Sequence, residues 1–181
     1  MKKYFLISLL FCSLYVFGQN PKMYKISIVP FFREQTLSDM QLYLKTDINF
    51  KVKKIEYKSP SSTRPIISYF LIPKKKQLKS QYFFSINISG YLETERDIDF
   101  VAGSFCSNCE YKDTLSPQKN GKVIIGYNSS QLSIFREHTF TDGKYVFTFY
   151  IVSKDNFKTL SKEKFINIFL NARIEEYYRS P

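Results

Sequence analysis

Two cysteines three positions apart, Cys106 and Cys109, are the constellation in this sequence with the clearest chemical potential. Two thiols at this spacing can form a local disulfide, bind a metal or carry out thiol exchange. Nearby thiols normally oxidise outside the cytoplasm, and the N-terminus described below predicts export, so we expect a structural disulfide between them. The ring that it closes is short, so the disulfide should add at most about 2 kcal/mol of stability.

The residues that lead into these cysteines suggest an alternative. Residues 98–109, IDFVAGSFCSNC, resemble the strand and active-site loop of thioredoxin-like proteins. That resemblance implies a thiol–disulfide oxidoreductase in which Cys106 is the nucleophile, with its thiolate favoured at a helix N-terminus, and Cys109 is the resolving thiol. Residues 118–180 contain no proline, so the cis-proline that this family places beside its active site has no counterpart in the C-terminal part of the chain. The oxidoreductase function is therefore kept as an alternative.

Other catalytic patterns are missing from the sequence. His138 is the single histidine, and we expect it to lie on the surface at a strand end. With Cys106 and Cys109 it supplies one ligand too few for a closed zinc site, so no metal is expected. No Gly-x-Ser-x-Gly elbow, Walker loop or Gly-x-Gly-x-x-Gly pattern occurs, and no cofactor is expected. These absences favour a non-enzymatic binding or structural module.

Four lysines, Lys74, Lys75, Lys76 and Lys79, lie close together between two strand-like runs, where we expect an exposed loop. The formal net charge of the chain is +11, which favours anionic partners. We expect an anionic glycan or lipid of the cell envelope, or another envelope protein, rather than nucleic acid. Two alternatives stay open: the lysines could be a solvated loop that keeps a sheet edge from aggregating, and AT-rich codons could produce the basic and aromatic excess.

The N-terminus has the three-part pattern of a secretory signal peptide. Two lysines precede an apolar stretch, and Gly18 is followed by the polar residues Gln19 and Asn20. We therefore expect a signal peptide over residues 1–18 and a single β-rich domain over residues 19–181, exported from a bacterial cell to the periplasm or beyond. The apolar stretch is too short for a spanning helix, so no transmembrane segment should remain after cleavage.

The domain is expected to be organised around residues 143–152. This run is apolar at odd and even positions alike, which predicts a central strand that is covered on both faces. Residues 41–53 alternate between apolar and polar side chains, which predicts a half-exposed strand or a hairpin that turns near Asp47. Shorter runs, including one at residues 97–101, complete an antiparallel β-sandwich-like domain of about seven to ten strands.

The C-terminal segment has a different period. Apolar residues recur at helical spacing from Ser161 onwards, which predicts one helix over residues 161–178 packed on the sheet. Ser161 can cap the start of this helix. An alternative architecture is a curved sheet that grips the helix around a small cavity, in which case the protein would carry a hydrophobic small molecule.

Overall fold

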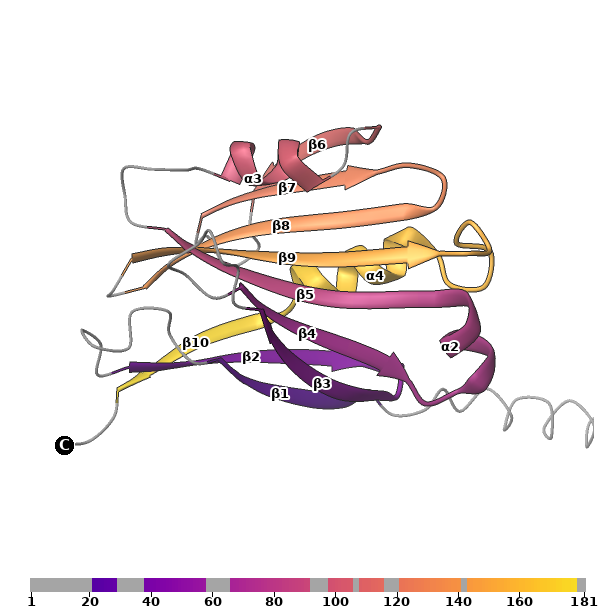
Figure 1. Cartoon of the computed structure of the whole chain (residues 1–181), viewed down its shortest axis with the longest axis horizontal. Helices are drawn as coiled ribbons and strands as arrows, with labels where there is room; N and C mark the ends of the chain where they lie inside the picture. The colour runs from indigo at the N-terminus through magenta and orange to yellow at the C-terminus, as the bar shows by residue number, and fades with distance from the viewer. Residues whose placement is uncertain are drawn as a thin grey trace, which may run out of the picture.

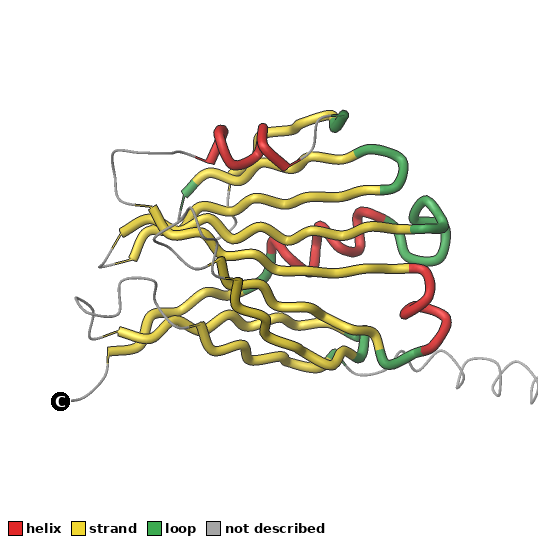
Figure 2. Tube along the Cα trace, viewed as in Figure 1, coloured by secondary structure: helices red, strands yellow, loops and turns green. Residues whose placement is uncertain are grey.

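The computed structural model describes residues 21–28, 38–57, 66–91, 98–105, 108–115, 121–140 and 143–178, so the predicted signal peptide lies outside the described residues. The described chain is mainly β, with two antiparallel sheets and helices at their faces and ends (Figures 1 and 2). The larger sheet has seven strands in the order β3-β4-β5-β9-β8-β7-β6, and the smaller has three in the order β1-β2-β10. The strands are β1 (Lys22–Ile28), β2 (Ser38–Thr46), β3 (Phe50–Tyr57), β4 (Ile66–Pro73), β5 (Tyr82–Tyr91), β6 (Glu110–Leu115), β7 (Lys122–Tyr127), β8 (Gln131–Phe140), β9 (Gly143–Ser153) and β10 (Arg173–Tyr178). The helices are α2 (Lys76–Gln81), α3 (Ile98–Phe105) and α4 (Lys162–Leu170).

The central strand predicted over residues 143–152 is confirmed as β9. It is the fourth of seven strands in the larger sheet and pairs with β5 on one side and β8 on the other. Tyr145, Phe147 and Phe149 point to one face, which we call the inner face, and all three are 0% exposed. Thr148 points to the opposite, outer face and is also buried. The two-sided apolarity of the run therefore reflects burial on both faces along much of β9.

The inner face is closed by α4 and by the smaller sheet. The ring of Phe169 on α4 stacks on Phe149 with centroids 4.6 Å apart, and the ring of Phe165 lies 5.3 Å from that of Phe84. The smaller sheet is tied to the larger one where the Tyr69 hydroxyl of β4 donates a hydrogen bond to a backbone carbonyl of β1 at 2.9 Å. Aromatic side chains of α4 and of the larger sheet therefore fill the space against the inner face.

The C-terminal helix is shorter than predicted. Ser161 caps its start, as expected, by accepting a hydrogen bond from the backbone N–H of Lys164 at 3.3 Å. The helix ends at Leu170, however, and the extension to residue 178 was wrong, because Arg173–Tyr178 forms β10 and pairs with β2. The open edge of β2 supplies backbone partners for these residues, and this tertiary pairing overrides their helical spacing.

On the outer face, α3 covers only the β7–β8 end of the sheet. A strand was predicted at residues 97–101, and this was wrong: residues 98–101 are helical, within α3, which packs on β7 and β8. The side chains that meet there are Ile98, Val101, Ala102, Ile124, Phe135 and Val146. The Tyr111 hydroxyl of β6 donates a hydrogen bond to the Ala102 carbonyl at 3.0 Å and holds the helix on the sheet.

The alternating segment at residues 41–53 changes sheet at its turn. Leu42, Leu44 and Phe50 are buried, as the alternation predicted, and the chain turns at Asp47. The hairpin alternative was wrong, because β2 belongs to the smaller sheet and β3 to the larger. The turn is therefore a corner that carries the chain from one layer to the other.

Candidate functional site

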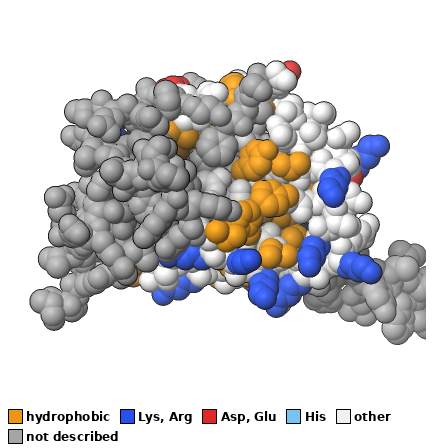
Figure 3. Space-filling model, in the orientation of Figure 1, with side chains coloured by type: hydrophobic (Ala, Val, Ile, Leu, Met, Phe, Trp, Pro, Cys, Tyr) orange, Lys and Arg blue, Asp and Glu red, His pale blue; other side chains and the backbone are white. Residues whose placement is uncertain are grey.

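A hollow of about 350 Å³ opens on the outer face of the larger sheet, over β3, β4 and β5. The helix α3 lies toward the opposite edge of this sheet (Figure 1). We call it the outer groove. Its apolar side chains come from three neighbouring strands and its charged ones from β3 and α2, and the outward-facing lining residues are Lys53, Ile55, Phe70, Ile72, Lys79 and Phe83. The space-filling view shows a hydrophobic band across the middle strands, with Lys and Arg side chains along one side and below it (Figure 3).

The apolar character of the groove comes from β5 and β4. Phe83 is 44% exposed although it lies next to Phe84, which points to the inner face and is 2% exposed. The rings of Phe70 and Phe83 meet edge to face with centroids 5.3 Å apart. A large aromatic pair left open on a sheet face is unusual for a soluble protein and marks a candidate contact site.

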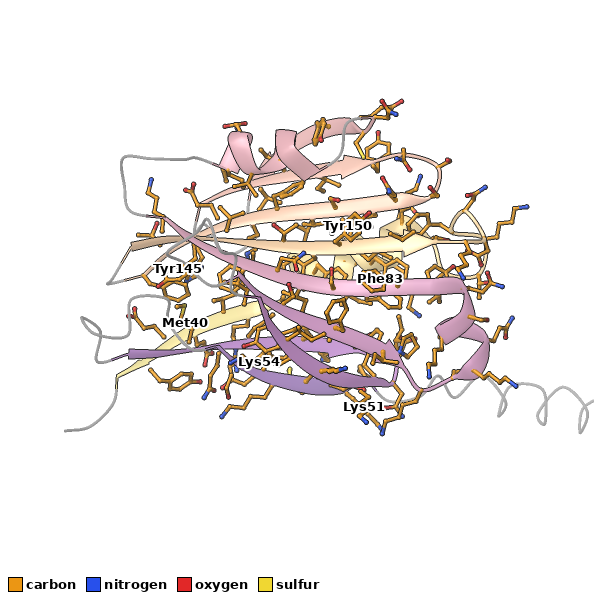
Figure 4. The ribbon with its side chains drawn as sticks, viewed as in Figure 1. Met40, Lys51, Lys54, Phe83, Tyr145 and Tyr150 are labelled. Atoms are coloured by element: carbon orange, nitrogen blue, oxygen red, sulfur yellow. The ribbon has the colours of Figure 1, made fainter. Side chains whose placement is uncertain are left out.

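The hydrophobic band continues onto β9 through Tyr150. Tyr150 pairs across the sheet with Ser85, so it is a diagonal neighbour of Phe83 on the outer face (Figure 4). Its hydroxyl accepts a hydrogen bond from the Gln131 amide at 3.1 Å, and burial raises the pKa of Tyr150. Tyr150 therefore presents a neutral phenol beside the groove.

The charge at the groove is positive. Lys53 on β3 and Lys79 on α2 line it, and none of its described lining residues is acidic. The lining likewise contains no histidine, serine or cysteine among these residues, so a nucleophile with a neighbouring base is not formed there. This arrangement suits the non-covalent binding of an apolar group that carries a negative charge.

The four predicted lysines do not act as one cluster. They were expected to share a loop, but only Lys74 and Lys75 precede α2, whereas Lys76 and Lys79 lie within it. Lys79 lines the outer groove, and Lys74 and Lys75 line a second hollow on the other side of α2. Lys76 is exposed and is part of neither lining. The helix therefore divides the lysines between two sites.

Of the two predicted disulfide cysteines, the structure describes only one. Cys109 is half-buried just before β6, with the Asn128 amide nitrogen 3.8 Å from its sulfur. Cys106 lies outside the described residues, so the disulfide stays a prediction. The helix α3 comes before the cysteines and a strand follows them, which is the reverse of the strand–loop–helix order that the thioredoxin-like resemblance implied.

His138 is not on the surface, as had been predicted, but is 6% exposed on the inner face of β8. Its ring centroid lies 4.4 Å from that of Phe140. Burial, together with the positive charge of Arg136, lowers the pKa of His138 to about 4, against a smaller opposing effect of Glu176. The imidazole is therefore neutral at physiological pH and is enclosed among core side chains.

Arg136 is the most deeply buried charged residue among those that the structure describes, at 0% exposed. Its guanidinium donates hydrogen bonds to the carbonyls of Leu170, at 3.4 Å, and Ala172. The Leu170 carbonyl ends α4 and the Ala172 carbonyl lies just beyond it, at the end of the helix where a cation is favourable because of the helix dipole. Burial lowers the pKa of Arg136 to about 10. Arg136 therefore ties the connection between α4 and β10 to the sheet, a role that the sequence did not suggest.

The groove residues were also missed at the sequence level, although a signal was present. Residues 82–86 begin with three adjacent aromatic residues, Tyr82, Phe83 and Phe84, and side chains alternate along a strand, so at least one of the three had to point to the face opposite the others. Within the described ranges, no three His, Cys, Asp or Glu side chains gather to hold a metal ion. The same residues include no helix of the length and apolarity needed to cross a membrane.

Comparison of the chain with family models, curated proteins and solved structures finds no match.

Proposed function

We propose that this protein is an exported, non-enzymatic binding module that takes an anionic amphiphile in the outer groove. The proposal includes secretion through the signal peptide of residues 1–18 and a β-sandwich-like arrangement of the two sheets. The ligand lays an apolar body on the ring pair of Phe70 and Phe83 and directs its anionic group to Lys53 and Lys79. An acidic lipid or lipid-linked component of the cell envelope has this chemistry.

The observation that carries the proposal is the open aromatic pair beside cations. Phe83 keeps 44% of its surface exposed on a sheet whose inner face is closed, so the groove is left open while the core is complete. A volume of about 350 Å³ lies within the range of small-molecule sites. The rim charges complement an anion and repel a cation of the same length.

The carrier alternative places the ligand elsewhere. A ligand held between the sheet and the C-terminal helix would need space on the inner face, where Phe149 and Phe169 are instead stacked at 4.6 Å. A hydrophobic ligand bound in the outer groove leaves the packing of Phe149 and Phe169 on the inner face intact. In this proposal the ligand is hydrophobic, as in the carrier alternative, but it binds on the protein surface, as expected of an envelope module.

The proposal is tested by calorimetric titration of the purified protein with dodecanoate and with dodecyltrimethylammonium, which share a chain length but differ in charge. Dodecanoate should bind more tightly. The variant Phe83→Ser should weaken dodecanoate binding about tenfold, because it removes most of an aromatic contact surface. The double variant Lys53→Gln/Lys79→Gln should remove the preference for the anion while keeping the binding of the chain.

Met23→Ser is the matched control, because Met23 is an exposed apolar residue on the smaller sheet, at 56% exposed. This variant should bind dodecanoate as the parent does. Equal binding of the two surfactants by the parent, or an equal loss in Met23→Ser and Phe83→Ser, would show that the groove is not the site.

A further inference from the structure

The second hollow, on the other side of α2 from the outer groove, has a volume of about 440 Å³. We call it the corner notch, because three segments meet there: the turn between β2 and β3, the start of α2 and the start of α4. Its polar lining residues are Asp47, Asn49, Lys74, Lys75 and Lys164, and its apolar ones are Ile48, Leu78 and Leu160. From this arrangement we propose that the corner notch is a phosphate-binding site, separate from the outer groove.

Cations outnumber anions around the notch. Lys164 of α4 forms an ion pair with Asp47, with its Nζ atom 2.7 Å from a carboxylate oxygen. Asp47 is the single acidic lining residue described, and this ion pair engages it. Lys74 and Lys75 have no ion-pair partner among the described residues. Two ammonium groups therefore remain at the rim of a hollow in which the potential is positive.

The amide of Asn49 adds a hydrogen-bond donor, because its oxygen already accepts a hydrogen bond from a neighbouring hydroxyl. The Tyr24 hydroxyl accepts a hydrogen bond from the backbone N–H of Phe50 at 2.8 Å and donates its proton to the Asn49 side-chain oxygen at 3.0 Å. The single proton of the hydroxyl goes to the amide oxygen in this arrangement, so the oxygen is the end of the amide that faces Tyr24. The Nδ2 atom is then the end of the amide that can donate to a ligand.

The backbone holds these groups in place. The Lys74 N–H donates a hydrogen bond to the Asn49 carbonyl at 2.8 Å, which joins the β4–α2 connection to the corner between the sheets. The Lys164–Asp47 pair joins the same corner to α4. The donors of the notch therefore come from segments that are fastened to one another, so little rearrangement of the backbone should be needed when a ligand binds.

The kind of donor favours phosphate over a carboxylate. A phosphate group has at least two charged oxygens with further acceptor capacity, and lysine ammonium groups bind it as point charges. Planar carboxylates are best recognised by the fork of arginine, and the described lining of the notch contains none. The phosphate could be free or part of a lipid headgroup, since the notch would recognise the same oxygens in both.

The test uses calorimetric titration of the purified protein with inorganic phosphate, and flotation with vesicles of phosphatidylglycerol or phosphatidylcholine, all at one ionic strength. We expect phosphate to bind, and phosphatidylglycerol to be preferred if the natural source is a lipid headgroup. Lys74→Gln/Lys75→Gln and Asn49→Asp should each weaken phosphate binding at least about tenfold. Asn49→Asp keeps an acceptor for the Tyr24 hydroxyl, so the fold should be retained, and thermal unfolding checks this.

Lys76→Gln is the control, because it removes one lysine charge from the next residue along the chain, the first residue of α2, which is not part of the notch lining. Phosphate binding should be unchanged in this variant and also in Phe83→Ser, which separates the notch from the outer groove. The proposal is overturned if neither phosphate nor phosphatidylglycerol binds, or if Lys76→Gln weakens binding as much as Asn49→Asp does.

Discussion

The two faces of the seven-stranded sheet carry aromatic side chains from the same strands but have different surroundings. On the inner face, Phe84 and Phe149 are covered by α4 and are at most 2% exposed. On the outer face, α3 covers β7 and β8, while Phe83 on β5 stays open beside Lys53 and Lys79. Apolar residues on both sides of a sheet therefore need not mean that both faces are covered along their whole width. Here one side is a core and the other, over part of its length, is a candidate binding surface.

Aromatic side chains on the two faces should contribute very differently to the stability of the fold. Phe149→Ala should lower the free energy of unfolding by about 3 to 5 kcal/mol, because it leaves a cavity against the stacked ring of Phe169. Phe83→Ala should change it by less than about 1 kcal/mol, because the ring is already largely in water. Urea unfolding of both variants measures the two values. A similar loss in both would mean that the outer groove is part of the core.

A second prediction concerns pH and the inner face. The pKa of His138 is about 4 in the folded protein, below the ordinary value of 6.5 expected when the chain is unfolded. Between these values the unfolded chain binds more protons, so the free energy of unfolding should fall as the pH is lowered from 6.5 to 4. The histidine should account for about 2 to 3 kcal/mol of that loss.

The variant His138→Leu isolates this contribution from that of the carboxylates, which begin to titrate in the same range. Urea unfolding at several pH values should show a smaller decline in the variant than in the parent. If the free energy of unfolding falls equally with pH in the two proteins, His138 becomes protonated in the folded state without cost. The inner face around His138 would then be open to water.

The smallest effect is expected at α3, which covers one part of the outer face and leaves the groove strands open. Tyr111→Phe keeps the ring, which lies against Gly126, but removes the hydrogen bond to the Ala102 carbonyl. We expect a loss of about 1 kcal/mol in the free energy of unfolding. Amide hydrogen exchange in α3 should become faster while exchange in β4 and β5 is unchanged. Faster exchange in all of these elements would mean that α3 and the groove strands open as one unit.

Local periodicity in the sequence predicted several elements well. The run at residues 143–152 identified the central strand, since few strands other than central ones are apolar at every position. Ser161 identified the start of the last helix, and Asp47 the turn between β2 and β3. These predictions succeeded because alternation, capping and turn formation depend on residues that are close together in the chain.

Predictions that depended on distant partners failed. Residues 173–178 became a strand because β2 offers them an edge, and residues 98–105 became a helix that packs on β7 and β8. His138 could be placed at a strand, but whether it faced water depended on which side α4 covered. The lysines could be recognised as a group, yet α2 separated Lys79 from Lys74 and Lys75.

The sequence by itself determined that this chain forms a mainly β structure with a central strand, a capped late helix and a strong positive charge, because composition and local spacing carry that information. The tertiary structure decided which sheet face became the core. It also placed Phe83 beside Lys53 and Lys79, and Asn49 beside Lys75 and Lys164. The physical reason is that a side chain's burial and its neighbours depend on the packing of segments far apart in the chain, whereas its local conformation depends mainly on the residues next to it.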